Sequence, residues 1–361
     1  MTTFSATLVQ TILSRFPDPD SFPYRSWCYP QGLMLWGMIR QWECTADNRL
    51  RIYVLQYANE HTAENGSISG FSGNSMDDMM AGSILAWAYE QTHERRYQLA
   101  CEKIFSCFKG YPRTSAGAFW HSRNLPGEFW VDGVFMGQMF LLEYARVFGA
   151  AEECWQETAK QIRLAHQCYQ KGDTGLLYHA FSENPNTTWA DPHTQCSPEV
   201  WSEGLGWYAL ILTRAFQRIP PEHPAHTEIA QHYTNLLKAL LRTQDSQNGL
   251  WYQVVDRSAE HDNWCDSSGS AMFAYALLCA LPHQLIDRKA CYDAVQRAYR
   301  GLLKNMKTGS DGLLDIYDAC DGLCVQPDYD HYVFYPKRVN AKEAVGAVLW
   351  FLVEYDHFFI I

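Results

Sequence analysis

The distribution of apolar residues along the chain predicts a protein built almost entirely of helices. Six segments are rich in glycine or alanine and apolar around most of a helical circumference; they cover residues 32–42, 79–91, 133–148, 204–216, 268–281 and 343–357. A helix that is apolar on all sides is buried inside a protein. We therefore predict six inner helices in these segments.

Amphipathic, more highly charged segments alternate with the inner ones, and this pattern is typical of half-exposed helices. They cover residues 2–15, 51–64, 95–108, 152–171, 226–243 and 288–306. Six buried and six amphipathic helices in alternation predict an all-α fold, the (α/α)6 barrel of six helical hairpins. The chain shows no linker or low-complexity tract, so we expect residues 1–361 to form a single domain.

A short motif recurs before several of the inner segments. A glycine is followed by apolar residues and then by a polar side chain at residues 117–121, 175–179, 249–253 and 312–315. Such a motif predicts a turn and a short extended piece that leads into the next inner helix. We expect the final polar side chain of each motif to point towards one end of the barrel.

Composition excludes several classes of function. The net charge of −11 argues against a nucleic-acid partner, because phosphate binding requires a basic surface. No apolar run approaches the length of a membrane span, and the first residues lack the pattern of a secretory signal. The 12 cysteines are scattered without a CxxC motif, which predicts reduced thiols in a cytoplasmic protein and no zinc site. The sequence leaves the oligomeric state open.

Aromatic residues make up 14% of the chain, with 13 tryptophans and 21 tyrosines. They could simply fill a large core, but flat rings also stack on the apolar faces of sugars. The candidate chemistry decides between these two interpretations.

Asp132 stands in a segment whose other residues are mostly apolar, Phe129 to Met136. A carboxyl group at the mouth of a buried helix is partly removed from water, which suits a general acid near neutral pH. The alternative is a helix N-cap, a position that aspartate favours. The same two interpretations apply to Asp77, which begins another inner segment.

The loops before the inner helices should converge on one end of the barrel, and they carry a set of polar and aromatic residues that suits a glycosidase. As catalytic carboxylates we select Asp132 and Asp77, since two neighbouring carboxylates can divide the roles of acid and base. As substrate-binding residues we select His179, Trp201, His121, Trp207, Asn74, Gln253 and Lys337. His179 could instead be a structural histidine, and Trp207 could belong to the core.

Several motifs in a fixed order resemble those of one enzyme family. They are NSMDD at 74–78 with Gly82, FWVDGVFM at 129–136, GLLYH at 175–179, CSPEVW at 196–201, GWYA at 206–209, GLWYQVVD at 249–256 and SSGSAMF at 267–273. Together they span most of the chain. The sequence resembles the unsaturated rhamnogalacturonyl hydrolases, glycoside hydrolase family 105, which are related to the unsaturated glucuronyl hydrolases.

The resemblance implies an (α/α)6 barrel and an unusual reaction on an unsaturated oligosaccharide left by a polysaccharide lyase. An aspartic acid protonates C4 of the C4=C5 double bond, water adds at C5, and the resulting hemiketal opens to release the neighbouring sugar. Asp132 matches the family's acid and base, and Asp77 matches a second carboxylate near the double bond. His179 and Trp201 match residues that contact the unsaturated sugar. No metal or organic cofactor is implied.

Two positions depart from the family's pattern. Glu203 stands where the family commonly has an arginine, which could bind the substrate carboxylate through two hydrogen bonds; a glutamate would repel it. Ala341 follows Asn340, where aspartate is more usual. Arg123, Lys337 and Arg338 are candidates for the missing cation. Two other functions stay open: another (α/α)6 enzyme such as a sugar epimerase, and a sugar-binding relative without activity.

Overall fold

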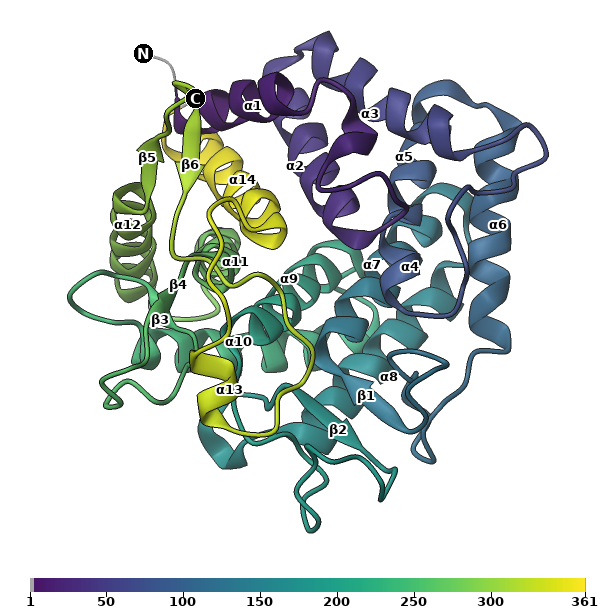
Figure 1. Cartoon of the computed structure of the whole chain (residues 1–361). Helices are drawn as coiled ribbons and strands as arrows, with labels where there is room; N and C mark the ends of the chain where they lie inside the picture. Colours follow the sequence, from purple (N-terminus) through teal and green to yellow (C-terminus); the bar gives the residue numbers. More distant parts are fainter. Residues whose placement is uncertain (1–2, 361) are drawn as a thin grey trace.

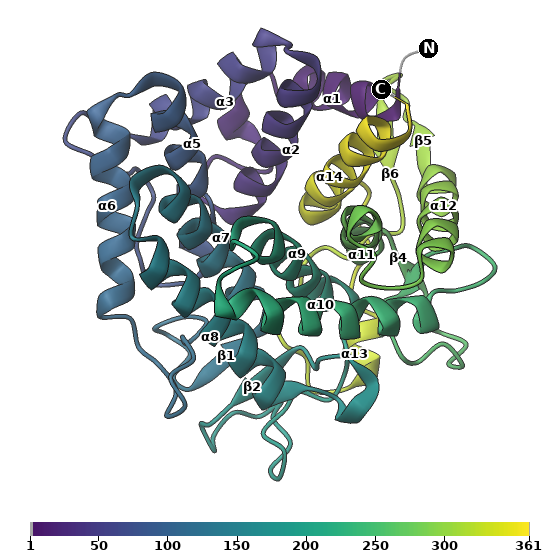
Figure 2. The same ribbon diagram turned by 180° about the vertical axis from the view of Figure 1, so that it is seen from behind.

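Helices alternate along the chain between an inner ring and an outer layer, which Figure 1 shows from one side and Figure 2 from behind. The structure, a computed structural model, describes residues 3–360. The inner ring consists of α2 (Tyr29–Thr45), α4 (Asp77–Met80) with α5 (Gly82–Thr92), α7 (Val131–Phe148), α9 (Ser202–Arg218), α11 (Ser267–Ala280) and α14 (Lys342–Phe359). The outer layer consists of α1 (Phe4–Arg15), α3 (Asn48–His61), α6 (Arg95–Lys109), α8 (Ala151–Tyr169), α10 (Pro224–Thr243) and α12 (Arg288–Lys304).

The inner helices form a ring, because each one packs on the next and α14 packs back on α2. Each outer helix runs back along the outside and packs on one or two inner helices. The alternation gives all inner helices the same direction, so their first turns lie at one end of the ring and their last turns at the other. The predicted all-α, (α/α)6 arrangement is confirmed; residue 2 of the first predicted segment lies outside the described residues.

Burial follows the pattern that predicted the two layers. Every residue of α11 is buried. In contrast, the outer helix α12 buries a single stripe with helical spacing, made of Cys291, Ala294, Val295, Ala298, Gly301 and Leu302. The inner helices are therefore apolar all round because they are covered on all sides, and the outer ones are amphipathic because solvent covers their other face.

Glycines in the inner helices allow close contact between neighbours. A Cβ atom on Gly37 of α2 would lie 2.6 Å from Leu349 of α14, and a Cβ atom on Gly346 of α14 would lie 2.7 Å from Leu33 of α2. Both distances are shorter than any van der Waals contact, so each leucine fills the space that a glycine leaves on the partner helix. This interlocking explains why the inner segments mix glycine with bulky apolar residues.

Short antiparallel strand pairs connect the helices at the end where the inner helices begin. β1 (Glu128–Trp130) pairs with β2 (Ala180–Ser182), β3 (Trp251–Tyr252) with β4 (Cys265–Asp266), and β5 (Met306–Thr308) with β6 (Leu314–Ile316). The glycines of the repeated motif, Gly117, Gly175, Gly249 and Gly312, all have positive φ angles between 78° and 95°. The motif is therefore a turn that glycine accommodates without strain, as the sequence predicted.

The inner helices differ from the predicted segments mainly where they begin. α7 and α9 each start two residues earlier than the glycines that marked their predicted starts, which places Asp132 and Glu203 in their first turns. The segment predicted as one helix over 79–91 is divided at Ala81 into α4 and α5. All 12 cysteines are free thiols. Among residues 3–360, no helix combines the length and the apolar character needed to cross a bilayer.

Candidate active site

The β1–β2 pair brings Asp132 and His179 together. Trp130 of β1 lies opposite Ala180 of β2, and the Val131 N–H donates to the carbonyl oxygen of His179 at 3.0 Å. Asp132 follows directly in the first turn of α7, so its carboxylate meets the imidazole, with Oδ2 3.1 Å from His179 Nε2. The N-cap of α7 is Trp130. The carboxylate therefore bonds a histidine 47 residues away and does not cap its own helix.

Tyr332 of the short helix α13 (Tyr329–Val333) fixes the orientation of His179. Its hydroxyl lies 2.9 Å from His179 Nδ1 and accepts the Gln326 N–H at 3.3 Å. Burial raises the pKa of Tyr332, so the hydroxyl keeps its proton and is able to donate it to Nδ1. In the tautomer with its hydrogen on Nε2, the imidazole accepts from Tyr332 and donates to Asp132 Oδ2. Asp132 Oδ1 remains available for a ligand.

Asp77 and His121 form a second carboxylate–histidine pair. Asp77 is the first residue of α4, and its Oδ2 lies 3.5 Å from Nε2 of the buried His121. The two segments are joined next to the pair, where the Met76 N–H donates to the His121 carbonyl oxygen at 2.9 Å. Burial alone would lower the pKa of His121, but the carboxylates of Asp77, Asp132 and Glu128 outweigh it and raise this pKa. His121 therefore tends to be a cation between the two catalytic candidates.

Trp130 lies between the two histidines. Its ring stacks on His121 with a centroid distance of 4.1 Å and lies edge-on to His179 at 5.8 Å. The indole N–H donates to Glu128 Oε2 at 2.8 Å, which fixes the plane of the ring. The two carboxylate–histidine pairs are thus held around one rigid aromatic side chain, the arrangement that two cooperating carboxylates require.

Trp201 covers the other side of His179. The two ring centroids are 4.5 Å apart, and Trp201 is only 1% exposed. Its indole N–H is buried and has no acceptor within residues 3–360. A Cβ atom on Gly204 would lie 2.9 Å from the Trp201 ring, so the glycine in the first turn of α9 lets this ring lie close to the helix. Trp201 therefore orients His179.

Glu203 is buried in an acidic cluster at the same end of the ring. The Ser268 hydroxyl oxygen lies 2.7 Å from Glu203 Oε2 and also 2.7 Å from Asp266 Oδ2. A hydroxyl group donates only one hydrogen, so one of the two carboxyl groups must donate a proton to it. Burial raises the pKa of Asp266, but its carboxylate accepts the backbone N–H groups of Gly269 and Cys320, which oppose this rise and favour its ionised form. Glu203 is therefore the group that carries the proton.

The electrostatic environment of Glu203 leads to the same conclusion. Burial raises its pKa well above the ordinary value, and the charges of Glu343 and Asp266 raise it further. A neutral Glu203 does not repel an anionic ligand, so this environment argues against the repulsion that the sequence suggested. Burial likewise raises the pKa of Tyr29, with further contributions from Glu343, Asp77 and Glu203, which places this cluster beside Asp77.

The remaining predicted residues lie at several depths. Trp207 is in the core below the site, 1% exposed and stacked on Phe135 at 5.1 Å. Gln253 is fully buried, and its Nε2 donates to the Tyr332 carbonyl oxygen at 3.3 Å, so it supports the tyrosine. Asn74 is exposed at the entry to α4, where its carbonyl oxygen accepts the Tyr111 hydroxyl hydrogen at 3.0 Å.

The three cations considered for the substrate carboxylate are already engaged. Lys337 Nζ lies 3.2 Å from Asp318 Oδ1 and 4.2 Å from the centroid of the Trp264 ring. Arg338 forms an ion pair with Asp321 at 3.2 Å. Arg123 donates to the backbone carbonyl oxygens of residues 73 and 110.

Lys342 is a cation that sequence reasoning missed. It begins α14, its Nζ lies 2.7 Å from Glu343 Oε1, and its side chain is 19% exposed. Burial alone would lower its pKa, but Glu343 and Glu203 outweigh this effect and raise it. Burial raises the pKa of the Cys324 thiol; Asp132, Asp77 and Glu128 raise it further, and Lys342 opposes them. Lys342 and both catalytic candidates therefore lie within electrostatic reach of one thiol.

Comparison with known proteins agrees with this geometry. The profile of Glycosyl Hydrolase Family 88 matches residues 5–359. A 24.9 kDa protein in the picA locus of Rhizobium radiobacter is 35% identical over 173 residues, which cover 47% of this chain and 72% of the relative. An unsaturated 3S-rhamnoglycuronyl hydrolase of Formosa agariphila is 21% identical over 179 residues, 48% of this chain and 46% of that enzyme.

Two solved structures have the same fold over almost the whole chain. A glycoside hydrolase from family 105 of C. acetobutylicum superimposes with a TM-score of 0.92 at 26% identity, covering 98% of this chain and 99% of the other. The unsaturated glucuronyl hydrolase of Bacillus sp. GL1 superimposes with a TM-score of 0.71 at 15% identity, covering 98% and 95%. The chain belongs to glycosyl hydrolase family 88, within the group of unsaturated uronyl hydrolases that also includes family 105.

Proposed function

We propose that this glycosidase removes the terminal 4,5-unsaturated uronic acid from a disaccharide that a rhamnogalacturonan lyase produces. The observation that carries the proposal is the Asp132–His179–Tyr332 chain, which holds one carboxylate oxygen and leaves the other open. The activities of two relatives, an unsaturated 3S-rhamnoglycuronyl hydrolase and an unsaturated glucuronyl hydrolase, support the chemical class. The 12 free thiols fit a reducing, cytoplasmic environment.

Asp132 acts as the general acid in this proposal. Because His179 occupies Oδ2, the transferable proton lies on Oδ1 and passes to C4 of the double bond. Positive charge develops at C5 and is shared with the ring oxygen. Water then adds at C5 and loses its proton to Asp132, directly or through Asp77, which restores the catalytic carboxyl group. The hemiketal opens to a ketone at C5 and a hemiacetal at C1. The hemiacetal collapses to an aldehyde, the bond to the leaving sugar breaks, and the hydroxyl proton of the hemiacetal passes to the leaving oxygen.

Lys342 is our candidate for the partner of the substrate carboxylate. It remains a cation, it lies in the first turn of α14, and the N-terminus of a helix attracts anions. A protonated Glu203 next to it adds no negative charge. Lys342 is paired with Glu343, so it serves this role by sharing its ammonium group between Glu343 and the substrate carboxylate. We therefore expect Lys342 to supply the positive charge that an arginine supplies elsewhere in the family.

The test follows the near-ultraviolet absorbance of the conjugated C4=C5 bond. Purified protein is incubated with unsaturated disaccharides from rhamnogalacturonan, glycosaminoglycan and other lyase digests. We expect the absorbance to fall fastest with the rhamnogalacturonan product. Unchanged absorbance with every substrate contradicts the proposed reaction, and a faster fall with a glycosaminoglycan product contradicts the proposed substrate.

The Asp132→Asn variant tests whether Asp132 is the general acid. The variant should lose about 10²–10⁴ in turnover, the usual contribution of an acid–base group. Asp173→Asn is the matched control, because it makes the same chemical change on an exposed loop. If Asp132→Asn keeps most of its activity while it folds normally, Asp132 is not the acid.

A further inference from the structure

A second cavity lies at the opposite end of the ring from Asp132. Its volume is about 280 Å³, close to the lower limit of typical small-molecule sites at about 300 Å³. It is lined by Trp36, Arg40 and Glu43 of α2, Arg214, Gln217 and Arg218 of α9, Tyr275 of α11, and Trp350 and Glu354 of α14. Most of these residues stand in the later turns of their helices, whereas the catalytic candidates stand in first turns.

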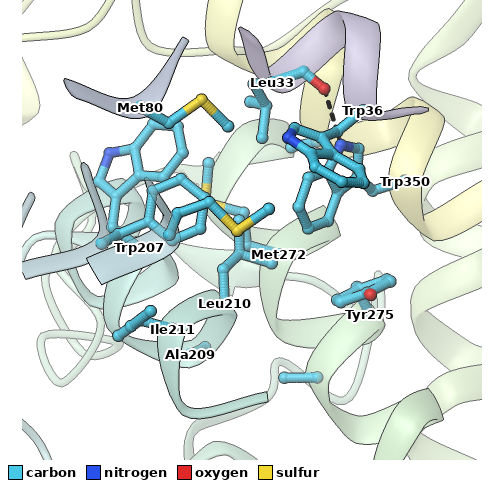
Figure 3. Packing of buried hydrophobic residues seen from close by; sticks show 14 of the residues in the cluster. Leu33, Trp36, Met80, Trp207, Ala209, Leu210, Ile211, Met272, Tyr275 and Trp350 are labelled. Carbon is cyan, nitrogen blue, oxygen red and sulfur yellow. Dashed lines mark hydrogen bonds between the residues drawn. The ribbon is translucent and has the colours of Figure 1, made fainter. Parts of the chain in front are cut away.

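A column of packed side chains separates this cavity from the candidate active site. Starting at the site end, Tyr29 contacts Trp207, Trp207 stacks on Phe135, and Phe135 contacts Trp350 with ring centroids between 5.1 and 6.5 Å apart. Figure 3 shows Trp207 beside Met80 and Met272, with Trp36, Trp350 and Tyr275 grouped on the other side. A ligand in the cavity would therefore not touch the catalytic carboxylates.

The α9 wall of the cavity carries more positive charge than its immediate partner neutralises. Arg214 and Arg218 both donate to Oε1 of Glu143. Arg146 donates to Oε2 of the same carboxylate and is also paired with Glu90, so the excess of positive charge lies on the two arginines of α9. Glu143 is fully buried. It is the carboxylate of α7 that pairs with both cavity arginines. The Arg214 Nε–H is buried and has no acceptor among residues 3–360.

The ionisation of these groups is consistent with that excess of cations. Burial alone would raise the pKa of Glu143, but Arg214, Arg218 and Arg146 outweigh it and lower it to about 2. Burial lowers the pKa of Arg218, and the neighbouring cations of Arg214 and Arg146 lower it further. An additional anion beside Arg218 would relieve this repulsion.

The other wall of the cavity is aromatic, and the indole N–H groups of its two tryptophans already have hydrogen-bond acceptors. The Trp36 indole N–H donates to the Ser83 hydroxyl oxygen, and the Trp350 indole N–H donates to the Leu33 carbonyl oxygen; both bonds are 2.7 Å long. Arg40 is held by Glu354 and Glu43. The Arg214 guanidinium lies over the Trp36 ring, 5.5 Å from its centroid, so the charged and aromatic walls meet at this residue. The other tryptophan surfaces towards the cavity are ring carbons, which pack on the apolar face of a sugar ring.

We propose that this cavity is a second binding site, for a small carboxylate the size of one sugar ring. Its carboxylate binds Arg214 and Arg218, and its ring lies against Trp36 and Trp350. Guanidinium groups bind carboxylates through paired hydrogen bonds, and aromatic rings complement sugars, so the two walls together recognise a sugar acid better than either part alone. The proposal is independent of the reaction assigned to Asp132.

The test measures D-glucuronate binding to the full-length protein by titration calorimetry, with glucose as the neutral counterpart. We expect one site with a dissociation constant below about 1 mM and at least tenfold weaker binding of glucose. Gln217→Glu places a negative charge at the exposed rim of the cavity and should weaken glucuronate binding at least fivefold. Gln10→Glu makes the same change at an exposed position of α1 and should leave binding unchanged.

A second variant tests the cation directly. Arg218→Met removes a charge at the end of α9, and Glu143 keeps its bonds to Arg214 and Arg146. Glucuronate binding should fall at least tenfold, while hydrolysis of unsaturated disaccharide stays near the wild-type rate. Equal binding of glucose and glucuronate overturns the proposal. Binding that is insensitive to Gln217→Glu but competes with the unsaturated disaccharide also overturns it, since the ligand then occupies the active site.

Discussion

Glu203→Gln tests whether a protonated carboxyl group is part of the folded core. Glutamine has nearly the same shape as a neutral glutamic acid, and its amide can donate to the Ser268 hydroxyl oxygen as the protonated carboxyl does. Unlike glutamate, it cannot ionise. The variant therefore removes one titration from the protein and leaves the packing of the first turn of α9 in place.

The expected effect depends on pH in a defined direction. In the unfolded chain the pKa of Glu203 is near 4.5, and in the folded protein it is raised well above this value. The folded state thus binds an extra proton between these two pKa values, and wild-type stability falls as pH rises through this interval. The slope is about 1.4 kcal/mol per pH unit for one group. The Glu203→Gln variant does not lose stability in this way. Its free energy of unfolding relative to wild type should therefore rise by about 1.4 kcal/mol for each pH unit within this interval.

The assay is urea unfolding followed by tryptophan fluorescence at pH 6, 7 and 8. The exposed Glu222→Gln is the matched control and should show no pH-dependent difference from wild type. The reasoning is refuted if the free-energy difference between Glu203→Gln and wild type stays constant across this range. A variant that becomes less stable than wild type at pH 8 would show that Glu203 is an ionised, stabilising group.

Three further predictions concern Tyr332, the Asp77–His121 pair and Glu143. Tyr332→Phe removes the donor to His179 Nδ1, so turnover should fall about tenfold, the equivalent of one hydrogen bond, with an unchanged circular dichroism spectrum. Asp77→Asn should lower the pKa of His121, which Asp77 raises against burial; the imidazole NMR titration measures it, and an unchanged midpoint contradicts the pairing. Glu143→Gln should cost about 3–5 kcal/mol of stability in urea at pH 7, because Arg214 and Arg218 lose their ion pair with Glu143 and Arg146 keeps its pair with Glu90. Since the folded pKa of Glu143 is lowered to about 2, this difference should shrink as pH falls from about 4.5 towards 2.

The fold could be predicted because the apolar pattern reports burial directly. Inner helices are apolar all round and outer helices are striped, and both patterns are local properties of the sequence. The starts of α7 and α9 were missed because Gly133 and Gly204 looked like helix boundaries. These glycines lie inside the helices, where they leave room for neighbouring rings. A Cβ atom on Gly133 would lie 3.0 Å from the His121 ring, and one on Gly204 would lie 2.9 Å from the Trp201 ring.

The members of the candidate site were selected one by one from the sequence, and the carboxylate–histidine pairs were not foreseen. Asp132, Asp77, His121 and His179 were all selected from their positions before inner helices. Their pairing depends on the β1–β2 register and on the contact between residues 76 and 121, which join segments distant in sequence. No local signal shows that Tyr332 reaches His179 across 153 positions. Trp207 was selected from a family motif, yet its neighbours Phe135 and Tyr29 enclose it in the core.

The common direction of the inner helices places different charged groups at the two ends of the ring. Carboxyl groups stand in the first turns, namely Asp77, Asp132, Glu203 and Glu343. The later turns carry Arg40, Arg146, Arg214 and Arg218, which are paired there with Glu43, Glu90, Glu143 and Glu354. This distribution complements the helix dipoles, which are positive at N-termini and negative at C-termini.

The same distribution creates a difficulty for an enzyme with an anionic substrate, because its reactive end is rich in carboxylates. Two features of the structure reduce the repulsion. Glu203 is kept neutral by burial, and the Glu343 charge is balanced by Lys342, with Tyr29 donating to it at 2.6 Å. The helix N-termini then act on the substrate carboxylate with little opposition. An enzyme with an acidic residue at position 203 binds an anionic substrate more easily when that residue is uncharged, and burial favours the uncharged form of Glu203.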